Sequence, residues 1–298
     1  MSIHCSDRRC NLYRWHTHLF AAPLLALLLS LWISTAARAQ LSVDQGWDLF
    51  VTDTGTSFAG VPFVGVPLNT FDFDNTFGRG IGVQNVGNTD TIIQRNAIAS
   101  VPGPAGALPQ TAAPIPIEMV ALQLVTAAPT NAFGPLDFYY ITLQSARGGP
   151  ASTGQMTIDF NNVNAPPPQQ PVNGTFTSFF DVFFDIREGS LTGPIVFSND
   201  LILTNSGTPW SHYASTTEYL IDGVNTNLDG NNDQLADFHV VSPIIESHPS
   251  GAQHVARTLL TSDVAPEPGS LLLLLGPVGA LTLIGACGRV RLRSRIAC

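Results

Sequence analysis

The chain contains no lysine, and it has four cysteines, all of which lie close to its two ends: Cys5, Cys10, Cys287 and Cys298. The long region between them therefore forms no disulfide, and it has no thiolate to act as a nucleophile or metal ligand. A region of this size can bury a core large enough to be stable without cross-links. We expect its stability to come from packing and hydrogen bonds alone.

Positive charge is scarce in the same region. Between Gln40 and Ala265 there are five arginines against twenty acidic residues, a formal charge near −15. Nucleic acids and anionic lipids are bound through cationic side chains, so this charge argues against both as partners. It fits a soluble extracellular protein, and it is compatible with a divalent cation.

Catalytic motifs are also missing. The chain has no G-x-S-x-G nucleophile motif, no H-E-x-x-H zinc motif and no phosphate-binding loop. Histidines gather in the C-terminal third, but without the spacing of a metal site, and we expect them to be scattered surface or half-buried side chains. We predict no catalytic residues and no cofactor other than a possible Ca²⁺. The histidines of the C-terminal third are His212, His239, His248 and His254.

The first 39 residues have the pattern of a secretory signal peptide. Arg8, Arg9 and Arg14 form a basic segment, and residues 19–33 are apolar. Small residues at Ala37 and Ala39 then supply the cleavage signature. We predict a signal helix over residues 1–39 that is cut after Ala39, so that export begins at the secretory translocon.

The C-terminus has the pattern of a single membrane span. Residues 270–287 are almost wholly apolar, and a helix of that length rises about 27 Å, close to the hydrocarbon thickness of a bilayer. Basic residues follow at once, and the positive-inside rule keeps them in the cytoplasm, so the preceding region faces outward. These basic residues are Arg289, Arg291, Arg293 and Arg295.

Pro266, Glu267 and Pro268 stand just before this span, and the two prolines hold the chain extended there. With the apolar segment and the arginines, they resemble the PEP-CTERM sorting signal of Gram-negative bacteria. The resemblance covers residues 263–298 only. It implies an inner-membrane intermediate, processing by an exosortase, a final place at the cell surface or outside the cell, and an association with exopolysaccharide.

The body, residues 40–262, consists of short segments rich in Val, Ile, Thr and Phe that are separated by Gly, Pro, Asn and Asp. This pattern is typical of strands and turns, and no sustained helical period occurs, so we predict an all-β, sandwich-like domain of antiparallel sheets. A Pro/Ala/Gly-rich stretch at 101–116 leaves open a division into two β lobes. The predicted strands cover residues 47–52, 89–98, 115–126, 136–145, 155–160, 175–187, 195–204, 235–241 and 253–260.

One loop carries a possible calcium site. Oxygen-bearing side chains recur through residues 225–237, and a glycine after the third of them permits a sharp bend, as in calcium-binding loops. The alternative is an ordinary turn, which the same residue types favour. The candidate ligands are Asn225, Asn227, Asp229, Asp233 and Asp237.

Two function classes follow from these patterns. The first is an exported, non-catalytic protein of the cell surface or extracellular matrix. The second is a carbohydrate-binding module or carbohydrate-active hydrolase, possibly calcium-dependent. Exposed aromatic side chains on one concave face would favour the second class, and the candidates are Trp210, Tyr213 and Tyr219.

Overall fold

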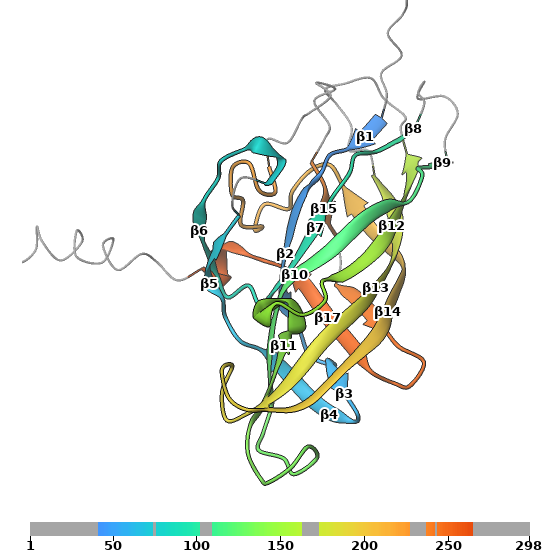
Figure 1. Cartoon of the computed structure of the whole chain (residues 1–298). Coiled ribbons are helices and arrows are strands. Elements are labelled where there is room, and N and C mark those ends of the chain that lie inside the picture. The colour runs from blue at the N-terminus through green and yellow to red at the C-terminus, as the bar shows by residue number, and fades with distance from the viewer. Residues whose placement is uncertain are drawn as a thin grey trace, which may run out of the picture.

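A computed structural model describes residues 41–73, 76–101, 109–162, 173–226, 237–241 and 243–264. Most of these residues are in strands, which confirms the predicted all-β class (Figure 1). In chain order the elements are β1 (Leu41–Val43), β2 (Gly46–Thr52), β3 (Ser57–Phe58), β4 (Val61–Gly65), β5 (Asn69–Asp72), the short helix η1 (Thr76–Gly78), β6 (Val83–Gly87), β7 (Thr91–Arg95), β8 (Ala99–Val101), β9 (Gln110–Thr111), β10 (Ile115–Thr126), β11 (Tyr139–Leu143), η2 (Gln144–Arg147), β12 (Ser152–Asn162), β13 (Asn173–Glu188), β14 (Ile195–Ser211), β15 (His239–Val240), β16 (Ile244–Ser247), β17 (Gln253–Thr258) and η3 (Thr261–Asp263).

The main sheet closes on itself. Its hydrogen-bonded neighbours run from β17 through β2, β7 and β10 to β11 and β12, then through β13 and β14 to β15 and β16, and β16 pairs again with β17. All pairings between these strands are antiparallel within the described residues. The result is a barrel-like sheet, in place of the two separate, face-packed sheets that the predicted sandwich would have.

Two long strands account for this difference. β13 and β14 pair from Asn173↔Ser211 to Arg187↔Ile195, well beyond the length expected for β14. At its other edge β13 pairs with both β12 and β11. β14 in turn reaches β15 and β16. Strands of this length twist enough to curl the sheet round until its two edges meet.

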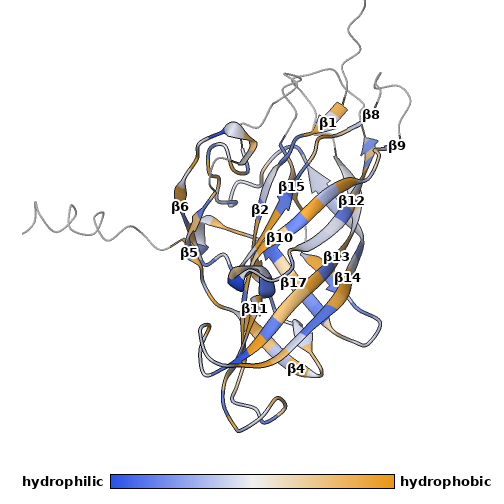
Figure 2. Ribbon diagram, viewed as in Figure 1, coloured by the Kyte–Doolittle hydropathy of each residue, from blue (hydrophilic) through white to orange (hydrophobic). Residues whose placement is uncertain are grey.

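The core fills the inside of the barrel. Along β13, Phe176, Phe180 and Phe184 point inward and are buried, whereas Phe179 points outward and is 41% exposed. This is the period-2 alternation expected of a strand. Figure 2 shows the same alternation of hydrophobic and hydrophilic residues along β10 and β13.

A second apolar cluster lies on the outer face of β2 and β7. Trp47, Leu49 and Ile92 point away from the barrel interior and pack against Phe73 and Val86. The hairpin β5–β6, which pairs outside the main sheet, supplies this cover (Figure 1). The barrel wall is therefore buried on both faces along these strands.

The observed strand boundaries agree best with the predicted ones where the alternation of apolar and polar residues continues over many positions. β10 covers Ile115–Thr126 as predicted, and β2 and β13 differ from the predicted ranges by a few residues. The short strands β1, β3 to β6, β8, β9 and β16 were not predicted. β2 and β7 precede the Pro/Ala/Gly-rich stretch and pair in one sheet with β10, which follows it.

The predicted signal helix and membrane span lie outside the described residues, as do their cleavage and sorting residues. Among the residues that are described, no helix is long and apolar enough to span a membrane. η3 and Val264 extend the ordered body slightly past the predicted boundary at 262.

Candidate functional site

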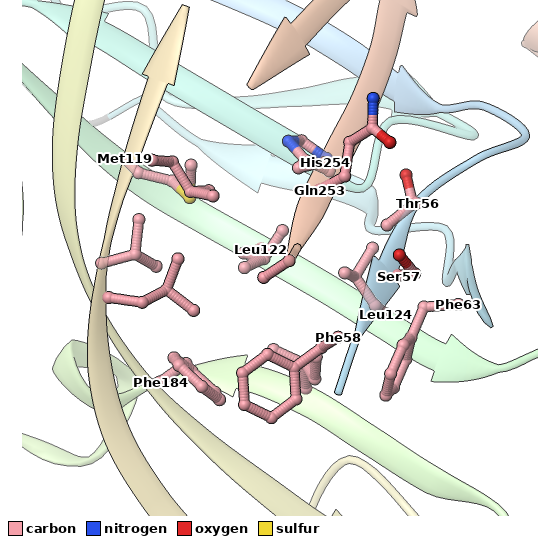
Figure 3. A pocket seen from close by; sticks show the side chains of 15 residues that line it. Thr56, Ser57, Phe58, Phe63, Met119, Leu122, Leu124, Phe184, Gln253 and His254 are labelled. Atoms are coloured by element: carbon pink, nitrogen blue, oxygen red, sulfur yellow. The ribbon is translucent and has the colours of Figure 1, made fainter. Parts of the chain in front are cut away.

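A small cavity of about 50 Å³ is lined by core residues of the barrel (Figure 3). Phe58, Phe63 and Phe184 lie at one end of it, and Gln253 and His254 lie at the other. This volume is well below the roughly 300–1,000 Å³ of a typical small-molecule site. Its wall is almost entirely carbon, so water is held there only weakly. The remaining lining residues are Thr56, Ser57, Met119, Leu122, Leu124, Ile141, Val182, Leu201, Leu203 and Ala252.

A chain of hydrogen bonds, here called the relay, begins at the polar end of this cavity. His254 on β17 has its Nδ1 2.9 Å from Oε2 of Glu246 on β16. Its Nε2 lies 3.3 Å from the hydroxyl of Thr52 and 3.5 Å from that of Thr91. Both hydroxyls donate to Oδ1 of Asp90, at 2.7 and 2.8 Å. The relay thus joins four neighbouring segments of the barrel through side chains that are buried, except for that of Thr52, which is half-buried.

The relay resembles a carboxylate–histidine–hydroxyl catalytic arrangement, but its hydrogen bonds have the opposite direction between the histidine and the hydroxyls. A catalytic histidine accepts the hydroxyl proton. Here Thr52 and Thr91 already donate to Asp90, so His254 Nε2 faces their lone pairs as a donor. Burial alone would lower the pKa of His254, but the hydrogen bond to Glu246 and the charges of Glu246 and Asp90 outweigh burial and raise the pKa. A histidine whose two ring nitrogens both face acceptors suits a structural role.

Asp90 is held tightly from the backbone as well. Its Oδ2 accepts the N–H of Thr52 at 2.8 Å, and the carboxylate rests against Gly65 of β4. Burial raises the pKa of Asp90, whereas the hydrogen bonds from Thr52 and Thr91 oppose that rise. A Cβ at Gly65 would overlap Oδ2 and lie 2.6 Å from Cγ of Asp90. A side chain at position 65 is therefore incompatible with the carboxylate where it stands.

A second buried group of charges centres on Arg95 of β7, whose side chain is fully buried. Its Nε donates to Oδ2 of Asp48 at 3.0 Å and its Nη2 to Oδ1 at 3.2 Å. Its Nη1 donates to the backbone carbonyl of Asp44. The guanidinium also lies 4.9 Å from the centre of the Phe238 ring, a cation–π distance. Burial raises the pKa of Asp48, and Arg95 opposes that rise.

Two histidines lie near this ion pair. Nδ1 of His239 is 2.9 Å from Oε1 of Glu218, and both side chains are buried. His212 donates from Nδ1 to the carbonyl of Asp237 at 2.7 Å, and its buried Nε2 has no hydrogen-bond partner among the described residues. Burial, with the charges of His239 and Arg95, lowers the pKa of His212 to about 3. His212 is therefore neutral at ordinary pH.

The structure places only part of the predicted calcium loop. Asn225 is 3% exposed, its Oδ1 accepts the N–H of Ile221 at 2.8 Å, and its Nδ2 donates to the carbonyl of Tyr219 at 3.0 Å. This amide stabilises a turn. Asn227, Asp229 and Asp233 lie outside the described residues. In the described part of the chain, no three His, Cys, Asp or Glu side chains are placed to hold a metal. The calcium site stays a prediction.

The aromatic side chains that might have formed a sugar-binding face do not share one. Trp210 is fully buried and packs on Phe160 and Phe238, with ring centres 5.3 and 5.4 Å away. Tyr219 packs against the outer apolar cluster, and Tyr213 is 47% exposed. No concave aromatic surface is built from these three residues.

Sequence reasoning missed both buried charge groups. Arg95, Asp48 and Asp90 sit among apolar residues in segments that predict ordinary strands. The available signal was the small number of arginines: the body has only five, so an arginine within a predicted strand is unusual. An arginine at an inward position of a strand requires a buried carboxylate partner. The partner itself lies 47 residues away in the sequence and cannot be read from local pattern.

The body is thus an all-β, barrel-like domain with an apolar interior and two internal charge groups. Comparisons with protein-family models, with curated proteins and with solved structures found no match to this chain.

Changing Gly65 to Ala tests the packing of Asp90. The new methyl group should displace the carboxylate from its three hydrogen bonds, and we expect a loss of roughly 2–4 kcal/mol in the free energy of unfolding. Chemical denaturation measures it. In an Asp90→Ala background the same change should cost much less, because the obstacle is gone. Additive losses in the double mutant would show that Gly65 and Asp90 do not compete for space.

His212 should make the protein acid-sensitive. Its pKa lies below the unfolded value of 6.5, so the unfolded chain binds more protons as the pH falls, and stability is lost from about pH 6.5 downward. The loss should reach roughly 3 kcal/mol by pH 4. His212→Asn keeps a donor for the carbonyl of Asp237 without titrating. The difference in stability between the two proteins should shrink as the pH falls, and a constant difference from pH 7 to 4 would contradict this.

Proposed function

We propose that this chain is an exported protein of the cell surface or extracellular matrix, sorted through its C-terminal tail by an exosortase, and that its body performs no catalysis. One observation carries the proposal: Pro266-Glu267-Pro268, the apolar residues 270–287 and the arginines that follow stand together at the end of the chain. The signal-peptide pattern that ends at Ala39 supports the same route through the translocon and the inner membrane.

The chemistry of the body supports a structural role. Within the described residues, the groups best placed for acid–base work are engaged with each other: His254 with Glu246, His239 with Glu218, and Arg95 with Asp48. All of these side chains are buried and away from bulk water. A catalytic group must instead reach a substrate in an accessible cleft.

Three properties of the body are compatible with a location outside the cell: the pairing of its strands, its stability without disulfides, and its negative charge. An open sheet edge offers unpaired backbone groups to other chains, and the pairing of β14 with β15 and β16 covers part of such an edge. The body also reaches stability without a disulfide, since it contains no cysteine. Its strong negative charge keeps separate copies apart.

The carbohydrate-active alternative has less support. Trp47 and Trp210 are the two tryptophans of the body, and both are buried. Stacking against a sugar ring needs an exposed aromatic face. Association with exopolysaccharide, which the tail implies, would then depend on surfaces other than these tryptophans.

The tail arginines should be needed for processing. Replacing Arg289, Arg291, Arg293 and Arg295 together by Glu removes the charge that holds the end of the chain in the cytoplasm. We expect the C-terminal cut to be lost while the body still folds, as measured by mass spectrometry of the recovered protein. The matched control replaces the same four residues by Lys, which keeps the charge and should be processed normally. Processing of the Glu variant at the normal rate would refute the proposed topology.

A further inference from the structure

A groove of about 610 Å³ lies on the outside of the barrel. It occurs where β10 changes partners: β10 pairs with β12 over Ile115 to Met119 and with β11 over Gln123 to Val125. Residues 120–122 fall between these two pairings, so the sheet has a gap on this edge of β10, while on the other edge Ala121 and Leu122 pair with β7. η2 and the turn between β13 and β14 border the gap on one side, and β5 borders it on the other.

Most of the groove surface is apolar. Val120, Ala121 and Leu143 form its floor, and Leu68 and Phe71 stand on the side of β5. The volume lies within the range of roughly 300–1,000 Å³ that is usual for small-molecule sites. An apolar floor of this kind favours a ligand with a hydrocarbon or aromatic body.

A positive charge stands at one end of the groove. Arg187 lines it, and the guanidinium is fixed by donating to Thr142 Oγ1 at 3.0 Å and to the carbonyl of Gly193 at 3.1 Å. Such fixed geometry costs a ligand little reorganisation.

The neighbouring charges leave this end positive. Arg147 and Arg187 share one buried carboxylate, that of Asp185, with N–O distances of 2.6 and 3.4 Å. Two guanidinium groups against one carboxylate leave this ion-pair cluster with one positive charge, and Glu188, next to Arg187 on β13, is not part of the cluster. This positive charge arises in a body with only five arginines and a formal charge near −15. An anionic group at the groove would complete the pairing.

We propose that this groove binds an amphiphilic monocarboxylate: an aromatic or aliphatic body on the floor of Val120, Ala121 and Leu143, with its carboxylate toward Arg187. Three features together support this ligand class: the apolar floor of the groove, the fixed guanidinium of Arg187, and the volume of the groove. It goes beyond the proposed function, because it gives the exported body a ligand, and it does not depend on how the tail is processed.

The test uses the full chain and 4-phenylbutyrate as the probe, with binding followed by calorimetry. 4-Phenylbutanol, which has the same body without the charge, should bind about tenfold more weakly, since it lacks the charge-assisted hydrogen bond to Arg187. Acetate, which has the charge without the body, should not bind measurably.

Two variants at exposed positions distinguish this site from others. Ala146→Trp fills the groove and should abolish binding, and Thr192→Glu sets a negative charge at the rim and should weaken the acid about tenfold while leaving the alcohol unchanged. Ala127→Trp, at an exposed position that does not line the groove, is the matched control and should bind as the unaltered protein does.

Arg187→Gln tests the cation directly, and Arg257→Gln is its control, since Arg257 pairs with Asp263 away from the groove. The first should remove the preference for the acid over the alcohol. Equal affinity for acid and alcohol in the unaltered chain, or unchanged binding in Ala146→Trp, would overturn the proposal. So would displacement of the probe by a neutral oligosaccharide such as cellotetraose, because the groove would then be a sugar site.

Discussion

Closure of the sheet depends on β14 being held at both edges. On one side it pairs with β13 along nearly its whole length, but on the other it meets β16 in a single residue pair, Thr204↔Ser247, and β15 in two. We call this second junction the seam. The N–H of Val241 adds one more bond across it, to the carbonyl of Pro209 at 3.1 Å. If the seam were open, β14 would become a long edge strand and the core would be exposed.

The buried charges stand close to this seam. His239 belongs to β15, and it pairs with Glu218 in a loop. His254 of β17 pairs with Glu246 of β16, and it also contacts the hydroxyl of Thr52 on β2. Each pair is costly to bury, yet breaking one would leave a lone charge inside the barrel. We interpret these buried ion pairs as contacts that determine which strands pair with each other. The apolar side chains supply most of the stability of the folded state.

The sequence predicted the strands with the strongest alternation and missed what depends on distant partners. β10 and β13 were found because their apolar residues recur with period two over many positions. β3 to β6 were missed because two to five residues carry little pattern. The barrel-like closure could not be foreseen, since strand order is set by long-range pairing. His239 was placed in an apolar strand, but its partner Glu218 lies in a loop 21 residues away. Of the calcium ligands, Asn225 makes side-chain hydrogen bonds to Ile221 and Tyr219, and these bonds stabilise a turn.

The central claim is that the seam is part of one cooperative, closed sheet. Amide hydrogen exchange as a function of denaturant tests it most directly, because amides released only by global unfolding share its free energy and its denaturant dependence. The closed sheet predicts that the amide of Val241 exchanges with the same opening free energy as those of β13 and β17. Exchange of Val241 through a low-energy opening that is insensitive to denaturant, while β13 stays protected, would contradict the account.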